Sequence, residues 1–80
     1  MAKQQRNEAL MKAIGEHFRQ LREERNMTQE QVAFVTRTYV PQIEKGVRNI
    51  SIGTLVKLCR FYEVTVLDFF KELEYDQTTL

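Results

Sequence analysis

The segment TQEQVAFVTRTYVPQIEKG, residues 28–46, strongly limits how this chain can fold, because it carries helix signals at both ends and no turn signal between them. Thr28 and Gln31 have the spacing of a capping box, so a helix begins there. Gly46 closes a second helical pattern, as glycine commonly does after the last helical residue. Between these signals there is no Gly, Asn or Asp, and Pro41 is the only helix breaker. The segment therefore predicts two short helices whose connection is unusual.

The rest of the chain also has helical periodicity. Apolar residues spaced by whole turns predict a helix from about Asn7 to Arg25. Ser51 is the cap of a mostly buried helix, and Thr65 with Asp68 caps a short final one. The apolar positions are Leu10, Ile14, Phe18 and Leu21 in the long helix, Val32 and Ala33 after Thr28, Ile52, Leu55, Val56, Leu58, Cys59, Phe61 and Tyr62 after Ser51, and Val66, Phe69, Phe70 and Leu73 after Thr65.

These signals predict an all-α fold, a single compact domain of five helices. We expect residues 1–8 to be a flexible N-terminal arm, residues 9–74 to form the domain, and residues 75–80 to be a loose tail. Eighty residues can bury only a small core, so dimerisation would help stability.

Composition excludes several classes of protein. One cysteine and one histidine cannot form an intramolecular disulfide or a zinc site on their own, so we expect no metal and no cofactor. Cys59 is interpreted as a small buried hydrophobe and His17 as a helix-surface residue. There is no apolar run of about 18 residues and no signal-peptide pattern, so we expect a cytoplasmic protein without a membrane segment. No nucleophile–base pair or phosphate-binding glycine loop indicates an enzyme.

The charge is unevenly distributed along the chain. Residues 1–60 carry 11 Lys or Arg and 6 Asp or Glu, whereas residues 61–80 carry Lys71 against five acidic residues. The net charges are +5 and −4, which sum to the overall +1. A basic body with an acidic end suits a protein that binds an anion through one face, although plain solvation explains the same pattern.

Three stretches together resemble the helix-turn-helix domain of the Cro/cI-type (XRE-like) bacterial and phage regulators. They are MTQEQVA, RTYVPQIEKGVRNIS and LVKLCRFYEVTVLDFF, within about residues 10–73. RTYVPQIEKGVRNIS is similar in particular to the small controller proteins of restriction–modification systems. The matching positions are Thr28, Gln29, Ala33, Arg37, Val40, Ile43, Glu44, Gly46, Asn49 and Ser51. The resemblance implies a lambda-repressor-like fold and a transcriptional regulator, typically a repressor, that binds double-stranded DNA. Since the sequence indicates no second domain for a ligand, no small-molecule ligand is expected.

By this resemblance, Arg37, Thr38 and Gln42 fall on the positions that contact bases from a helix in the major groove. The chemistry agrees, because Arg pairs with guanine, Gln pairs with adenine, and Thr bonds either base edge. Contacts to the DNA backbone are expected from Gln29, Tyr39, Lys45, Arg48 and Asn49. For Arg37 the alternative is an internal salt bridge or plain solvation, and for Tyr39 it is packing. Glu44 is interpreted as a structural residue that pairs with a nearby arginine.

A two-fold dimer on a palindromic operator is expected, since pairing doubles the few base contacts of one module. The predicted dimer interface lies on the last helix and consists of Val66, Leu67, Phe69, Phe70 and Leu73. An alternative function is an antitoxin-like or scaffold module that acts mainly through protein–protein contacts.

The connection between the two short helices departs from the family pattern. That pattern has about six residues between the positions of Ala33 and Arg37, where this chain has three, and the usual glycine is among those absent. Three outcomes stay open. Thr36 caps a helix that starts at Arg37; the two helices fuse, kinked at Pro41, and favour a swapped dimer; or the distortion abolishes specific DNA binding.

Overall fold

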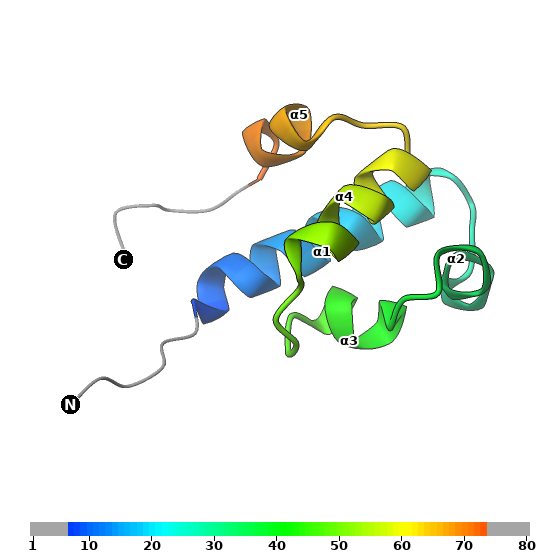
Figure 1. Ribbon diagram of the computed structural model, residues 1–80, viewed down its shortest axis with the longest axis horizontal. Helices are drawn as coiled ribbons and strands as arrows, with labels where there is room; N and C mark the ends of the chain where they lie inside the picture. The colour runs from blue at the N-terminus through cyan, green and yellow to red at the C-terminus, as the bar shows by residue number, and fades with distance from the viewer. Residues whose placement is uncertain (1–6, 74–80) are drawn as a thin grey trace.

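The computed structural model describes residues 7–73, which form five helices and no strands (Figure 1). In chain order the helices are α1 (Glu8–Glu24), α2 (Gln29–Thr36), α3 (Val40–Lys45), α4 (Ile52–Phe61) and α5 (Val66–Lys71). The predicted all-α architecture is confirmed. The predicted arm, residues 1–8, and the tail, residues 75–80, lie almost wholly outside the described residues.

The helix starts follow from local capping chemistry. The Thr28 hydroxyl accepts from the Gln31 backbone N–H at 3.1 Å, and the Gln31 side chain accepts from the Thr28 N–H at 2.8 Å. Ser51 and Thr65 likewise accept from backbone N–H groups three residues later, at 3.0 Å each. These three predicted caps are confirmed. Asn7 caps α1 in the same way, since its side chain accepts from the N–H of Leu10.

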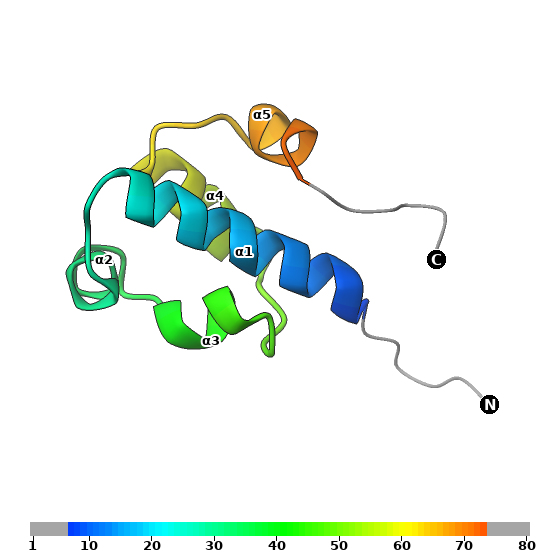
Figure 2. The same cartoon turned by 180° about the vertical axis from the view of Figure 1, so that it is seen from behind.

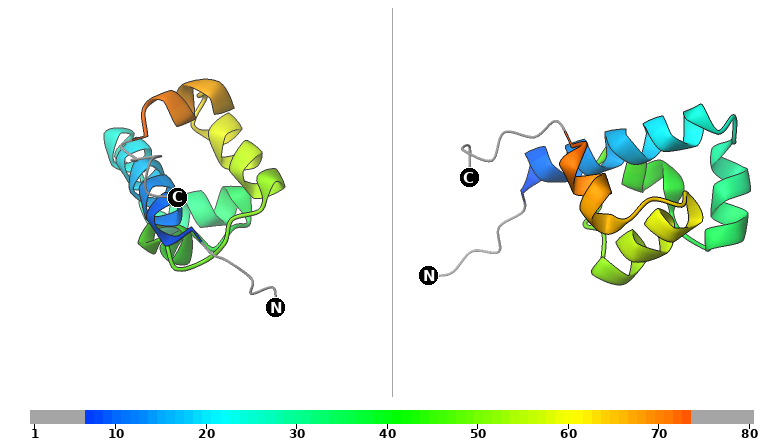
Figure 3. Two further views of the ribbon diagram at one scale, coloured as in Figure 1. Left: turned by 90° about the vertical axis from the view of Figure 1, so that its left-hand side faces the viewer. Right: turned by 90° about the horizontal axis from the view of Figure 1, so that it is seen from above.

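The long helix α1 is the centre of the fold. In Figures 1 and 2 α5 lies above it and α3 below it, and Figure 3 shows the same order from the side. One core joins the helices, and Val32, Phe18, Cys59, Tyr62 and Phe69 are its most buried members, with at most 1% of each residue exposed. The interpretation of Cys59 as a buried hydrophobe is confirmed, and burial raises the pKa of its thiol. His17 is only half-exposed, with its ring centroid 4.7 Å from that of Phe69.

The connection between α2 and α3 corrects the first two expected outcomes. The helices do not fuse, and the second of them starts at Val40 rather than at Arg37. Pro41 explains this boundary. In a helix that begins at Arg37, Pro41 would have no N–H to donate to the Arg37 carbonyl, and its ring would crowd that carbonyl. In α3, Pro41 lies in the first turn, where no backbone donor is needed. The Thr36 hydroxyl therefore caps nothing and donates to the Val32 carbonyl at 2.8 Å.

Arg37 supplies the conformation that glycine supplies in the family pattern. It ends α2 in the left-handed region, with φ 58° and ψ 43°, and its N–H donates to the Ala33 carbonyl at 2.8 Å. For a residue with a Cβ this conformation costs about 1–2 kcal/mol. The short connection thus closes within one chain, and nothing in residues 7–73 requires exchange between protomers.

Helices α1 and α3 approach closely at Gly15. A Cβ at this position would lie 2.3 Å from the Ile43 carbonyl oxygen and 2.7 Å from that of Glu44. Both neighbours are backbone atoms of α3, so neither can move aside without shifting that helix. A side chain at residue 15 would therefore displace the helix that carries Gln42 and Lys45.

We expect Gly15→Ala to lower the free energy of unfolding by about 1–3 kcal/mol, through overpacking. Gly53→Ala is the matched control, because its Cβ would meet nothing nearer than the Ser51 hydroxyl at 3.9 Å. Alanine favours helices, so this control should be neutral or slightly stabilising. Urea unfolding followed by circular dichroism gives both values. Equal stability of the two variants would contradict the close approach.

Helix α5 corrects part of the predicted dimer interface. Phe69 is 1% exposed, and its ring centroid lies 4.4 Å from that of Phe18, so it belongs to the core of its own chain. Leu73 is half-buried and packs against the same core. The remaining members of the predicted set stay at the surface, with Val66 36%, Phe70 39% and Leu67 67% exposed. A six-residue helix has room to bury only one of its faces.

Candidate nucleic-acid interface

A hollow of 290 Å³ lies beside the α2–α3 turn and the loop after α3. Five of the predicted contact residues line it: Arg37, Thr38, Tyr39, Arg48 and Asn49. Thr38 was expected to contact bases from a helix, and this placement is wrong, because Thr38 lies in the turn before α3. Its hydroxyl bonds instead to that of Thr36 at 2.8 Å.

Aromatic rings support the two arginines of this hollow. The Arg48 guanidinium lies over the Tyr39 ring, 4.3 Å from its centroid, and that of Arg37 lies 5.4 Å from the centroid of Phe34. None of residues 7–73 pairs with either guanidinium in an ion pair or hydrogen bond. The expected alternative of an internal salt bridge for Arg37 is therefore not realised in this part of the chain. Both groups keep their donors free for an anion or a base edge.

Helix α3 presents two further predicted contact residues. Gln42 and Lys45 are exposed, while Val40 and Ile43 are buried with 3% and 6% exposed, as their spacing predicts. Along the chain, this helix lies directly between the turn that carries Arg37 and the loop that carries Arg48. Asn49 in that loop is also exposed. Helix α3 thus exposes Gln42 and Lys45 between the two segments whose residues line the hollow, although neither of these side chains lines it.

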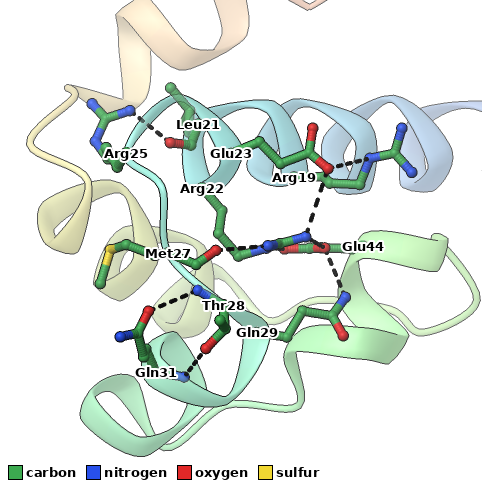
Figure 4. Close-up of polar contacts among 10 residues, drawn as sticks. All are labelled: Arg19, Leu21, Arg22, Glu23, Arg25, Met27, Thr28, Gln29, Gln31 and Glu44. Atoms are coloured by element: carbon green, nitrogen blue, oxygen red, sulfur yellow. Dashed lines mark hydrogen bonds and ion pairs between the residues drawn. The ribbon is translucent and has the colours of Figure 1, made fainter.

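A buried ion pair fixes α3 against α1 (Figure 4). Arg22 on α1 donates from two nitrogens to the Glu44 carboxylate, at 2.8 and 3.0 Å, and from a third to the Met27 carbonyl at 2.8 Å. The Glu44 side chain is only 3% exposed. The hydrogen bond to Glu44 is the main reason why the pKa of Arg22 is raised. The interpretation of Glu44 as a structural partner of an arginine is confirmed.

Gln29 has a structural role that the sequence did not indicate. Its amide nitrogen donates to the second Glu44 oxygen at 2.9 Å, so the start of α2 is tied to the same carboxylate (Figure 4). An amide nitrogen has two N–H groups, and this bond uses one of them. Gln29 is half-buried, so its expected contact with DNA backbone stays a prediction.

Lys57 on α4 was missed by the sequence reasoning. Its ammonium donates to the Thr36 carbonyl at 2.9 Å, which satisfies an acceptor at the end of α2. The two residues are 21 positions apart, and no local spacing predicts their contact. Lys57 therefore links α4 to the turn that carries Arg37.

Within residues 7–73 no group of three or more His, Cys, Asp or Glu side chains is placed to hold a metal ion. None of the helices in that range combines the length and apolar character needed to cross a lipid bilayer.

Comparison with known proteins decides the family. The helix-turn-helix family model HTH_3 matches residues 18–69, which include α2, the turn, α3 and α4. The chain belongs to the helix-turn-helix family. It is also 39% identical, over 63 residues, to the control protein C.BamHI of Bacillus amyloliquefaciens, an alignment that covers 70% of this chain and 78% of that protein. The resemblance to XRE-type regulators and to restriction–modification controller proteins is thereby confirmed.

Solved structures of helix-turn-helix proteins have the same fold. The restriction–modification controller protein C.AhdI from Aeromonas hydrophila has a TM-score of 0.71 and 31% identity, covering 78% of this chain and 98% of that one. The controller protein C.Esp1396I, solved as a tetramer with its natural 35 base-pair operator, has a TM-score of 0.69 and 29% identity, covering 78% and 86%. The clp gene regulator ClgR from Corynebacterium glutamicum has a TM-score of 0.74 and 26% identity, covering 79% and 70%.

Proposed function

We propose that this chain is a sequence-specific transcriptional regulator that binds double-stranded operator DNA with the turn before α3, α3 itself and the loop after it. The observation that carries the proposal is the hollow, in which the guanidinium groups of Arg37 and Arg48, unpaired within residues 7–73, lie beside Thr38 and Asn49. The C.Esp1396I complex supports it, since that relative binds a natural operator.

Each part of this surface has a distinct task. Arg37, Thr38 and Gln42 present the donors and acceptors that distinguish base pairs in the major groove. Tyr39, Lys45, Arg48 and Asn49 surround them and bind phosphates, which set register and most of the salt-dependent affinity. Gln29 at the start of α2 is proposed as a further phosphate contact.

The DNA-binding state is proposed to be a two-fold dimer on a palindromic operator. Val66, Leu67 and Phe70 supply the exposed apolar surface on α5. In Figures 1 and 2 α5 lies on the opposite side of α1 from α3, so pairing through it leaves the DNA-binding surface free.

Selection of duplexes from a randomised pool by the purified chain tests the proposal. We expect recovery of an inverted repeat, whose half-site spacing reflects the distance between the two α3 helices of the dimer. Recovery of no common sequence, at salt concentrations where binding to random duplex persists, would show that the chain is not sequence-specific.

Lys45→Ala should weaken binding to selected and random duplexes alike and lower the slope of log K against log salt by about one unit. The reason is that one phosphate contact releases roughly one counterion, whatever the sequence. Lys71→Ala on α5 is the control, because it removes an equal charge away from the proposed surface. A salt titration of binding measures both slopes. Equal slopes for the two variants would remove Lys45 from the interface.

A further inference from the structure

Phe34 on α2 is a large aromatic residue that the fold does not use. It is 73% exposed, which is more than any other aromatic side chain among the exposed large hydrophobics of the described residues. The Arg37 guanidinium lies 5.4 Å from the centroid of its ring, within the range of a cation–π contact. The ring therefore contacts a residue of the proposed DNA-binding surface.

The backbone around Arg37 is fixed from several directions. Its own N–H donates to the Ala33 carbonyl, and the carbonyl of the preceding Thr36 accepts from Lys57. The left-handed conformation at Arg37 sets the direction in which its side chain leaves the turn. The remaining freedom lies in the side chain itself, whose rotamers are costly to fix on binding.

We propose that Phe34 is a positioning residue for DNA recognition, and that it acts by holding the Arg37 guanidinium in the orientation used to read a base. This inference rests on the proposed function, in which Arg37 contacts a base. The Phe34 ring has no nitrogen or oxygen atom that could accept a hydrogen bond, whereas arginine recognises guanine through its N–H donors. The Phe34 ring therefore orders the group without occupying any of its donors.

A double-mutant cycle between Phe34→Ala and Arg37→Ala tests this inference, with Phe34→Leu and Phe34→Tyr as matched variants. The probes are the duplex selected from the random pool and a scrambled duplex of the same length. We expect Phe34→Ala and Phe34→Leu to weaken binding to the selected duplex by about two- to five-fold, which is the range of an exposed cation–π contact. Binding to the scrambled duplex, the salt slope and the melting temperature should stay unchanged, and Phe34→Tyr should bind like the parent chain.

The decisive result is the coupling between the two sites. In the Arg37→Ala background, Phe34→Ala should have no further effect, because the group that the ring orders is gone. If Phe34→Ala lowers the affinity for the selected duplex equally in both backgrounds, the inference is overturned. It is also overturned if Phe34→Leu binds that duplex as tightly as the parent chain.

Failure of the inference differs from failure of the proposed function. If the parent chain and Arg37→Ala bind selected and scrambled duplexes with equal affinity, the proposed function itself is wrong, and the inference with it. If the parent discriminates between the duplexes, Arg37→Ala discriminates less well, and Phe34→Ala discriminates as well as the parent, only the role of Phe34 is wrong.

Discussion

Glu44→Ala is expected to lower the free energy of unfolding by about 3–5 kcal/mol, the range for removing one partner of a buried ion pair. The substitution leaves the Arg22 guanidinium, whose side chain is 12% exposed, without its carboxylate. It also removes the acceptor of Gln29, so α1, α2 and α3 all lose a shared contact. Native proteins are stable by only about 5–15 kcal/mol, so this loss is a large part of the total.

Glu23→Ala is the matched control for this variant. Glu23 also faces arginines, at 3.8 Å from Arg19 and 4.0 Å from Arg22, but its side chain is 60% exposed. Exposed pairs contribute about 0–1 kcal/mol, so this control should unfold close to the parent chain. Urea titration followed by circular dichroism measures both variants. A loss below about 1 kcal/mol for Glu44→Ala would show that the buried pair does not hold α3 in place.

Phe69→Ala should lower the free energy of unfolding by about 3–5 kcal/mol, because it empties the centre of the contact between α1 and α5. The Phe18 ring loses a neighbour at 4.4 Å and the His17 ring loses one at 4.7 Å. This effect belongs to the single chain, so the loss should be the same at low and high protein concentration once dimerisation is accounted for.

Leu67→Asp changes an exposed residue on the same short helix as Phe69. It should weaken dimerisation and leave the stability of the single chain almost unchanged. Leu67 is 67% exposed, so the stability of the single chain should change by less than about 0.5 kcal/mol. The dimer should dissociate at concentrations where the parent chain stays paired. Sedimentation equilibrium and urea unfolding at two concentrations separate the effects. If a Phe69→Ala chain is as stable as the parent but no longer dimerises, Phe69 belongs to the dimer interface and not to the core.

The features that the sequence predicted well depend on neighbours along the chain. The caps at Thr28, Ser51 and Thr65 each join a side chain to a backbone group three residues away. The burial of Val40 and Ile43 follows from helical spacing alone. Such patterns are visible before any tertiary contact is known.

The features that it missed depend on contacts across the fold. The course of the α2–α3 connection depends on Lys57, which is distant in sequence, and on a left-handed arginine that residue preferences do not favour. In α5, Val66, Leu67, Phe69 and Phe70 occupy four of six helical positions, so no polar face marks which side packs inward. Contacts of Phe69 with Phe18 and His17 on α1 determine which side of α5 packs inward.

The turn that carries Arg37 is proposed to read DNA sequence. The affinity of Arg37→Gly for the selected duplex, divided by its affinity for the scrambled duplex, tests this proposal. Glycine accepts the left-handed conformation, so this variant should fold about 1 kcal/mol more stably than the parent. Glu63→Gly, at φ 60° after α4, is the control that relieves a similar backbone without touching the surface. We expect this affinity ratio to be roughly 5- to 150-fold smaller in Arg37→Gly than in the parent chain, which is the contribution of one bidentate base contact. In Glu63→Gly the ratio should equal that of the parent. An Arg37→Gly chain that discriminates between the duplexes as well as the parent would contradict the proposal.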